Sequence, residues 1–261
     1  TGSSTIVLET AKAIRNNGGY PVIFSYVDGP FRKEFEKLNI SVIINNFAIS
    51  DDFSFIHFAK NFDIIIANTV VVYPAIHMIQ NLVSTIWYIH EAENIESFFI
   101  PHFNNEDLTL KDVLIGTNSH VYVASEYSKN VVKKYNNNVK LLKYGIDDLF
   151  QDNEIIISDE IQFSIVGTIE ERKAQDVFIQ AIMLMPIEYQ KKAIFNIIGN
   201  EDNEKNFVSD LKKRSKHIPN IKWHGLITDQ KDKLELFLDT SLFVVISRDE
   251  PVSVVVIEAA M

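Results

Sequence analysis

The sequence contains no cysteine, no long hydrophobic run and no excess of basic side chains. The absence of cysteine excludes disulfide bonds and thiolate metal sites, and it fits a reducing compartment. No apolar run reaches the length that a membrane-spanning helix needs. The opening residues, 1–4, do not form a secretory signal peptide. We therefore expect a cytoplasmic protein without an integral membrane segment, and a peripheral contact with the inner face of a membrane is left open.

Acidic side chains outnumber basic ones along the whole chain. The formal net charge is −10, and residues 1–152 and 153–261 each carry an acidic excess. Neither half is a basic module of the kind that binds nucleic acid, and neither carries a polybasic stripe for anionic lipid. We expect no nucleic-acid partner. No cluster of His, Asp and Glu has the spacing of a metal site, so we expect no metal ion and no cofactor.

Glycine is scarce, and the nine glycines never form the G-x-G-x-x-G turn of dinucleotide-binding enzymes. A nicotinamide-dependent oxidoreductase is therefore the last-ranked hypothesis. The 261 residues, 46% of them hydrophobic, can bury a sizeable core and fit one large or two medium α/β domains. No internal repeat or low-complexity tract is present.

Apolar strand-like runs alternate with helical segments along the chain. This alternation predicts parallel, doubly wound sheets in two Rossmann-like halves that face a ligand cleft. The polar segment Asp147–Glu160 marks the boundary, which gives domains 1–150 and 151–261. The continuous apolar run Asp63–Asn68 predicts a strand covered on both faces, and Asp51 is expected to cap the helix before it.

Both ends of the sequence look cut. Residues 1–4 read as a turn, and the helix Thr5–Ile14 follows with Ser3 or Ser4 as its N-cap. An α/β domain normally opens with a strand, and the last helix has barely two turns when the sequence stops. We expect that the first strand and the C-terminal helices are missing.

The segment Ser247–Met261, SRDEPVSVVVIEAAM, is the strongest candidate for a ligand site. It follows the apolar run Ser241–Ile246, which predicts a buried strand, and it carries Glu250 and Glu258. A helix opening near residue 252 or 253 would turn free amides toward an anion, and the two carboxylates suit sugar hydroxyls beside it. A helical Glu is more often solvated, but the apolar neighbours of Glu258 predict a buried acid.

The turn after Val166 is the second candidate. Gly167 ends a predicted strand, and Arg172 and Lys173 precede a predicted helix. A glycine lets the backbone approach a ligand, and the two cations suit a diphosphate. The alternative is a solvated pair of cations on a surface loop.

The third candidate is His90, at the end of the predicted strand Thr85–Ile89. The carboxyl end of a parallel strand faces the ligand in this kind of sheet. A lone histidine at a strand end is more often structural than catalytic. The other six histidines have no comparable context.

Several of these segments resemble the retaining family-4 (group 1) glycosyltransferases. Residues 250–259 are similar to the family's E-P-x-x-x-V-V-x-E-A signature, and residues 167–176 to its G-x-x-x-x-R/K-K-G-Q-D loop. Trp87–Glu91 resembles the family's strand end with a His that contacts the donor sugar. Ser125–Lys129 with Gly145–Asp147 resembles the S-E-x-S-K … G-I-D pair, and Gly2 resembles a glycine turn near the ligands.

The resemblance implies a metal-independent retaining glycosyltransferase of GT-B fold. It would move a hexosyl-type sugar from a nucleotide-diphosphate sugar to a saccharide or lipid-linked acceptor, in the synthesis of a cell-surface polysaccharide or glycoconjugate. The implied catalytic residues are His90 and Glu250, where Glu250 contacts the sugar. The implied donor-binding residues, with Glu258 on the ribose, are Gly2, Gly167, Arg172, Lys173, Pro251, Val252, Ser253 and Glu258.

Three positions depart from the family pattern. Thr168 and Ser253 stand where many relatives carry Arg and Gly, and Ala174 replaces a usual Gly. A non-catalytic two-domain α/β protein that binds a nucleotide or sugar is the alternative, and an inactive fragment is a further one.

Overall fold

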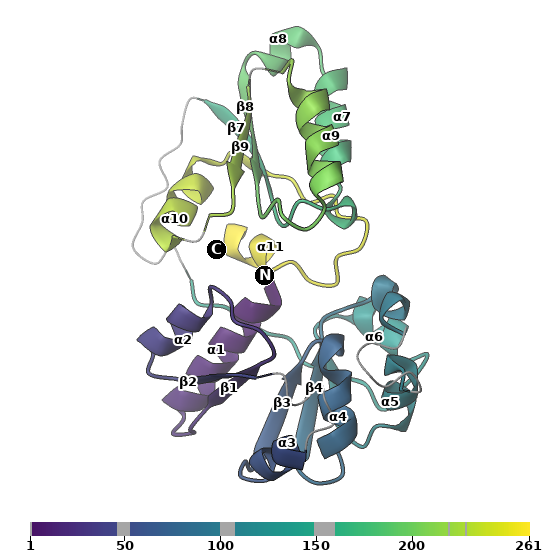
Figure 1. Ribbon diagram of the computed structural model, residues 1–261. Helices are drawn as coiled ribbons and strands as arrows, with labels where there is room; N and C mark the ends of the chain where they lie inside the picture. The colour runs from purple at the N-terminus through teal and green to yellow at the C-terminus, as the bar shows by residue number, and fades with distance from the viewer. Residues whose placement is uncertain (1, 46–52, 100–107, 149–159, 219, 228) are drawn as a thin grey trace. The chain divides into compact units, whose positions relative to one another are not determined.

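The computed structural model describes residues 2–45, 53–99, 108–148, 160–218, 220–227 and 229–261. The chain divides into two compact units, residues 2–146 and residues 147–261 (Figure 1). The predicted helix cap at Asp51 and the predicted boundary between residues 150 and 151 lie outside the described residues.

The first unit alternates strands and helices. Its elements are α1 (Gly2–Asn16), β1 (Val22–Ser25), α2 (Arg32–Lys37), β2 (Ser41–Ile44), α3 (Phe53–Ala59), β3 (Ile64–Asn68), the 3-10 helix η1 (Val70–Val72), α4 (Tyr73–Ile79), β4 (Ser84–Ile89), the 3-10 helix η2 (Glu93–Phe98), α5 (Leu110–Gly116), β5 (His120–Val123), α6 (Glu126–Val132) and β6 (Lys140–Leu141).

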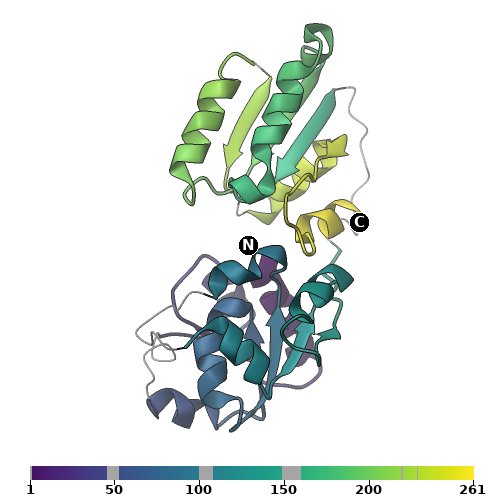
Figure 2. The same cartoon turned by 90° about the vertical axis from the view of Figure 1, so that its right-hand side faces the viewer.

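The second unit repeats this pattern. Its elements are β7 (Ile161–Val166), the 3-10 helix η3 (Glu171–Lys173), α7 (Gln175–Leu184), α8 (Ile187–Gln190), β8 (Ala193–Ile198), α9 (Lys205–Ser215), β9 (Ile221–Gly225), α10 (Gln230–Asp239), β10 (Leu242–Phe243) and α11 (Val254–Ala259). Figure 2 shows α7 and α9 on one face of the sheet that contains β7 and β9.

Every strand pair is parallel, and this confirms the predicted α/β class. The second unit has one sheet with the order β10-β7-β8-β9. In the first unit the sheet order is β3-β4-β5-β6, and β1 and β2 pair with each other in a separate two-stranded sheet. The single sheet predicted for this half is therefore in two pieces, since no hydrogen bonds join β1 to β3 within the described residues.

Each unit has its own apolar core between its sheet and its helices. In the first unit Trp87 of β4 is fully buried among side chains of β5, α4 and α5. In the second unit Phe195 of β8 packs with side chains of α7 and α9. Because these cores hold the strands rigidly, the carboxyl ends of the parallel strands give fixed positions to the turns that follow them.

Two predicted buried strands are partly exposed. In β3 the side chains of Ile64 and Ile66 are 47% and 38% exposed, so the prediction of cover on both faces is wrong. In the run 241–246 only Leu242–Phe243 forms a strand, and Leu242 and Val245 are 50% and 47% exposed. The reason is the same in both cases. β3 and β10 are edge strands, so each pairs with a neighbouring strand on one side of the sheet order.

The first helix also differs from its prediction. α1 begins at Gly2, so residues 3 and 4 lie within its first turn and do not precede it as a cap. Gly2 is the first residue of a helix and is exposed, and the glycine turn predicted at this position is not formed. The apolar face of α1, with Ile6 and Ala11 buried, explains why the helix extends through this stretch.

Candidate functional site

The first turn of the candidate site begins where β7 ends. Gly167 has a φ of +153°, and its N–H donates to the Ile198 carbonyl at 2.9 Å. A Cβ atom at Gly199, which follows β8, would lie 1.8 Å from the Gly167 carbonyl oxygen. The two backbones can approach this closely only because residue 199 is glycine, whereas a Cβ atom at Gly167 would meet the Lys173 side chain at 3.4 Å. The sequence interpretation misses Gly199, although it follows β8 just as Gly167 follows β7.

A buried glutamine closes this turn. Gln175, the first residue of α7, donates from Nε2 to the Thr168 carbonyl at 2.9 Å, and its Oε1 accepts from the Glu170 N–H at 3.4 Å. Ala174 before it has φ 60° and ψ 32°, the left-handed conformation. This conformation costs a residue with a Cβ atom roughly 1–2 kcal/mol, which explains why related loops favour glycine here.

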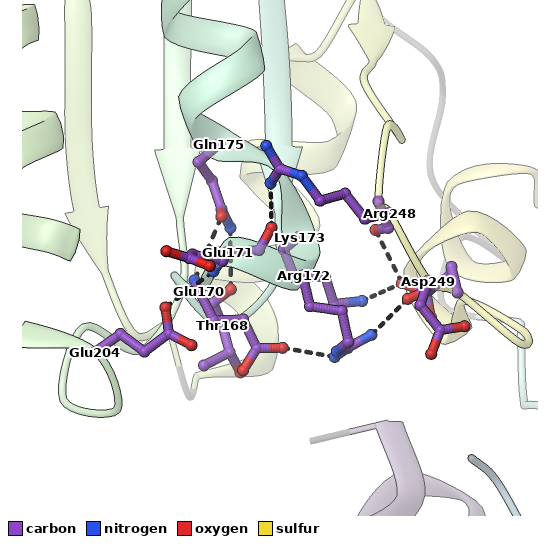
Figure 3. A network of polar contacts seen from close by, with 11 residues as sticks. Thr168, Glu170, Glu171, Arg172, Lys173, Gln175, Glu204, Arg248 and Asp249 are labelled. Atoms are coloured by element: carbon purple, nitrogen blue, oxygen red, sulfur yellow. Dashed lines mark hydrogen bonds and ion pairs between the residues drawn. The ribbon is translucent and has the colours of Figure 1, made fainter. Parts of the chain in front are cut away.

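The second turn, residues 247–253, connects β10 to α11 and lies against the first. The Arg248 N–H donates to the Arg172 carbonyl at 2.8 Å. In return the Arg172 Nη1 donates to the Asp249 carbonyl at 2.8 Å, and the Arg248 guanidinium donates to the Glu171 carbonyl (Figure 3). Each turn therefore holds an arginine that binds the backbone of the other turn.

The two arginines also bind carboxylates. Arg172 Nη2 donates to Glu170 Oε1 at 2.6 Å, and Arg248 donates to both oxygens of Asp176 at 3.0 and 2.7 Å. The hydrogen bond from Arg248 lowers the pKa of Asp176 below its ordinary value, against the opposing effect of burial. The bidentate geometry fixes the planar guanidinium in one orientation. The sequence interpretation gives no role to Arg248 or Asp176.

Lys173 and Glu250 meet between the two turns. The Lys173 ammonium forms an ion pair with Glu250 Oε2, which also accepts from Ser247 Oγ at 3.1 Å. The two side chains are 16% and 18% exposed. They line a small pocket together with Val166, Val244, Ser247 and Ser253, among others. A ligand anion that entered this pocket would compete with Glu250 for the ammonium group.

Glu258 lies in α11 and is 4% exposed, as its apolar neighbours predict. The Lys233 ammonium of α10 forms an ion pair with Oε1. The other carboxylate oxygen, Oε2, is buried and has no hydrogen-bond partner among the described residues. A buried acceptor without a partner is costly, because such an oxygen loses its water without a replacement. No local sequence pattern points to Lys233.

The remaining predicted residues of the second turn are less distinctive. Pro251, Val252 and Ser253 are half-buried, and α11 begins after Ser253, which makes no side-chain cap. A larger hollow of about 550 Å³ lies against α9, and half of the residues that line it are lysines. None of the residues that line it belongs to either turn.

His90 follows β4 in the first unit. Its Nε2 lies 2.7 Å from Asn68 Oδ1 at the end of β3, and its ring packs at 4.5 Å from the Tyr88 ring. Burial lowers the pKa of His90 to about 4, so the imidazole is uncharged at neutral pH. The Glu91 carboxylate turns back to the backbone and accepts from the N–H groups of Val70 and His90 at 3.2 and 3.1 Å.

The described residues contain no group of three or more His, Asp and Glu side chains arranged to hold a metal ion. In the same parts of the chain, no helix has the length and hydropathy of a membrane span. Gly2, a predicted donor-binding residue, is the first residue of α1 and lies in a helix and not in a turn.

The sequence was compared with families of known proteins. Residues 147–261 match the profile of the family described as glycosyl transferases group 1. No curated protein matches the sequence.

The fold was compared with solved structures. The Anabaena protein Alr3699/HepE in complex with UDP and glucose superposes with a TM-score of 0.78 at 16% identity, over 99% of this chain and 74% of that chain. A glycosyltransferase from Rickettsia africae gives 0.67 at 16% identity, over 94% and 68% of the two chains. WaaG, a glycosyltransferase involved in lipopolysaccharide biosynthesis, gives 0.63 at 14% identity, over 99% and 75%. At these identities the likeness establishes the fold alone.

Proposed function

We propose that this chain, a group 1 glycosyltransferase of the GT-B fold, is a retaining enzyme. It transfers a hexosyl-type sugar from a nucleotide-diphosphate sugar to a saccharide or lipid-linked acceptor, without a metal ion. One observation carries the proposal. Two turns that bind each other, after β7 and β10, hold Lys173 in an ion pair with Glu250. In α11, which follows, Glu258 is buried, and its Oε2 has no hydrogen-bond partner among the residues that the structure describes.

The charges of the reaction match these groups. When the acceptor hydroxyl bonds to the anomeric carbon, the bond from that carbon to the diphosphate breaks, and negative charge grows on the departing phosphate. Lys173 and the amides of the two turns stabilise this charge in place of a metal ion. The acceptor proton moves to a leaving-phosphate oxygen, so no protein base is required.

Glu250 and Glu258 have separate roles in this proposal. Once phosphate takes the Lys173 ammonium, the Glu250 carboxylate is released to accept hydrogen bonds from hydroxyls of the transferred sugar. The free oxygen of Glu258 accepts from a ribose hydroxyl, while Lys233 holds the other oxygen. His90 contacts the transferred sugar, and Gly167 lets the backbone approach the diphosphate.

The bound molecules of the structural neighbours support this choice of substrate. HepE binds UDP and glucose, and TarM of S. aureus is described with UDP and a GlcNAc-glycerol. We therefore place a uridine donor first among the nucleotides to be tested. A role in polysaccharide or glycoconjugate synthesis in the cytoplasm, at the membrane face when the acceptor is lipid-linked, belongs to the same proposal. Residues 2–146 would serve the acceptor and residues 147–261 the donor.

Titration calorimetry with UDP-, GDP-, ADP- and dTDP-sugars tests the proposal. We expect one nucleotide to bind, and Lys173→Ala and Glu258→Ala each to weaken it about tenfold, the loss of roughly one charged hydrogen bond. Lys231→Ala is the control, because Lys231 also lies in an ion pair but its side chain is 81% exposed. Unchanged affinity in both site variants would refute the proposed donor site.

A non-catalytic nucleotide- or sugar-binding protein remains the second candidate. The ion pair between Lys173 and Glu250 favours this second candidate. When the cation and the anion of a site already neutralise each other, the site can bind a ligand without catalysing a reaction. A turnover assay separates the two. Release of nucleotide diphosphate that depends on an added saccharide acceptor supports transfer, whereas binding without release supports the second candidate.

A further inference from the structure

Asn68 and His90 face each other across two neighbouring strands. β3 and β4 are parallel, and Asn68 is paired in register with Tyr88, two residues before His90. His90 Nε2 lies 2.7 Å from Asn68 Oδ1. An amide oxygen only accepts hydrogen bonds, so Nε2 must carry the ring proton. The second ring nitrogen, Nδ1, is then an acceptor, and it has no partner among the described residues.

Within the described residues, two aromatic rings lie near the His90 ring and burial accounts for its lowered pKa. The rings of Tyr88 and Tyr144 lie 4.5 and 6.4 Å away. The Tyr88 hydroxyl donates to the Leu142 carbonyl at 2.6 Å, and burial raises the pKa of Tyr88. The Glu91 Oε2 accepts from the backbone N–H of His90. With burial also lowering the pKa of His90 to about 4, the ring stays neutral over the physiological range.

The residue after Asn68 is held in a strained conformation. Thr69 has φ 75° and ψ 169°, a region that β-branched residues rarely enter. Its N–H donates to the Tyr88 carbonyl at 2.8 Å, and its carbonyl accepts from Trp87 Nε1 at 2.8 Å. The Thr69 hydroxyl is buried and has no hydrogen-bond partner in the part of the chain that the structure describes. Backbone strain that neighbouring hydrogen bonds maintain is concentrated at functional sites, and here it lies next to Asn68.

We propose that Asn68 is a positioning residue that holds His90 as the Nε2–H tautomer, so that Nδ1 accepts a hydrogen bond from a hydroxyl of the transferred sugar. His90 then orients the sugar, and its ring neither gives up nor takes up a proton during the reaction. The role of the sugar hydroxyl depends on the proposed function. The tautomer does not, because it is a property of the protein alone.

NMR of the chain labelled with ¹⁵N-histidine measures the tautomer. The His90 resonances are assigned by their loss in His90→Gln. We expect a protonated Nε2 and an unprotonated Nδ1 that persist when the pH is lowered to 5.5. A protonated Nδ1, which the opposite orientation of the Asn68 amide would produce, would overturn the proposal, as would a ring that titrates near its ordinary pKa.

Asn68→Asp tests whether Asn68 sets this state. The new carboxylate would stabilise the imidazolium, and we expect the pKa of His90 to rise by about one unit or more. Asn17→Asp is the control, because Asn17 is an exposed residue at the end of α1. An unchanged His90 titration in Asn68→Asp would overturn the assignment. If that variant does not fold, the tautomer of the unaltered chain and of Asn68→Ser decides the same question.

Ligand affinity tests the contact with the sugar. We expect Asn68→Ala to weaken binding of the nucleotide-diphosphate sugar about fivefold and to leave the affinity for the nucleotide diphosphate unchanged. Equal losses for both ligands would overturn the positioning role. If no nucleotide binds to the unaltered chain, the proposed function fails, and the contact with the sugar fails with it, while the NMR result still decides the tautomer.

Discussion

The guanidinium of Arg248 binds both carboxylate oxygens of Asp176, at 3.0 and 2.7 Å. This ion pair connects the turn after β10 to the start of α7. The Arg248 N–H also donates a hydrogen bond to the Arg172 carbonyl. Asp176 thereby binds a cation that a ligand phosphate would otherwise attract. This arrangement supports the proposal that Lys173 is the cation that meets the ligand and that Arg248 holds the two turns together.

Arg248→Ala should weaken nucleotide-diphosphate binding about tenfold, because the turns lose the guanidinium contacts with the Glu171 carbonyl and the Asp176 carboxylate. The change in stability should be small, since the Arg248 side chain is 48% exposed. Calorimetry and thermal unfolding measure the two effects. Arg214→Ala is the matched control, because Arg214 pairs with Asp210 on α9 away from both turns. Equal effects of the two substitutions on affinity would contradict the role of Arg248.

Glu250→Gln should tighten binding of the free nucleotide diphosphate about threefold and reduce transfer. The substitution removes the carboxylate that competes with phosphate for the Lys173 ammonium, and it also removes the charged acceptor proposed for the sugar hydroxyls. Calorimetry and a turnover assay with the same donor measure both effects. Weaker binding of the nucleotide diphosphate in Glu250→Gln would show that Glu250 does not compete for Lys173.

Lys233→Met should lower the free energy of unfolding by about 2 kcal/mol, because it leaves the Glu258 carboxylate buried without its cation. The double variant Lys233→Met with Glu258→Gln should recover much of this loss. Chemical denaturation measures each free energy. Lys231→Met on the same helix is the control, and we expect a change within about 0.5 kcal/mol because its pair is exposed. A double variant no more stable than Lys233→Met would argue against a buried charge pair.

His90 should make the first unit less stable as the pH falls. The folded pKa of about 4 lies below the ordinary value of 6.5, so the unfolded chain binds more protons between these values. Stability is therefore complete above about pH 6.5 and is lost progressively toward pH 4. Relative to His90→Gln, the unaltered chain should lose about 2 kcal/mol between pH 7 and pH 4.5. Denaturation of both chains at the two pH values measures this difference, and parallel behaviour would refute the neutral, buried ring.

The local pattern of the sequence was enough to predict the α/β class, most helices and strands, and the burial of Glu258. These features depend on neighbours in the sequence, since apolar spacing decides whether a segment forms a helix or strand. The turn at Gly167 after β7 could be predicted for the same reason.

The partners of the site residues depend on the tertiary structure. Lys173 and Glu250 are 77 positions apart, and Lys233 and Glu258 are 25 apart. Strand order brings such residues together, and no periodicity in the sequence encodes it. Strand order also decides which apolar strands lie at a sheet edge, which is why Ile64 and Leu242 are half-exposed. The sequence by itself therefore determined most of the elements. The tertiary structure decided which strands lie at an edge and which charges meet, because both depend on contacts through space between groups that are far apart in the chain.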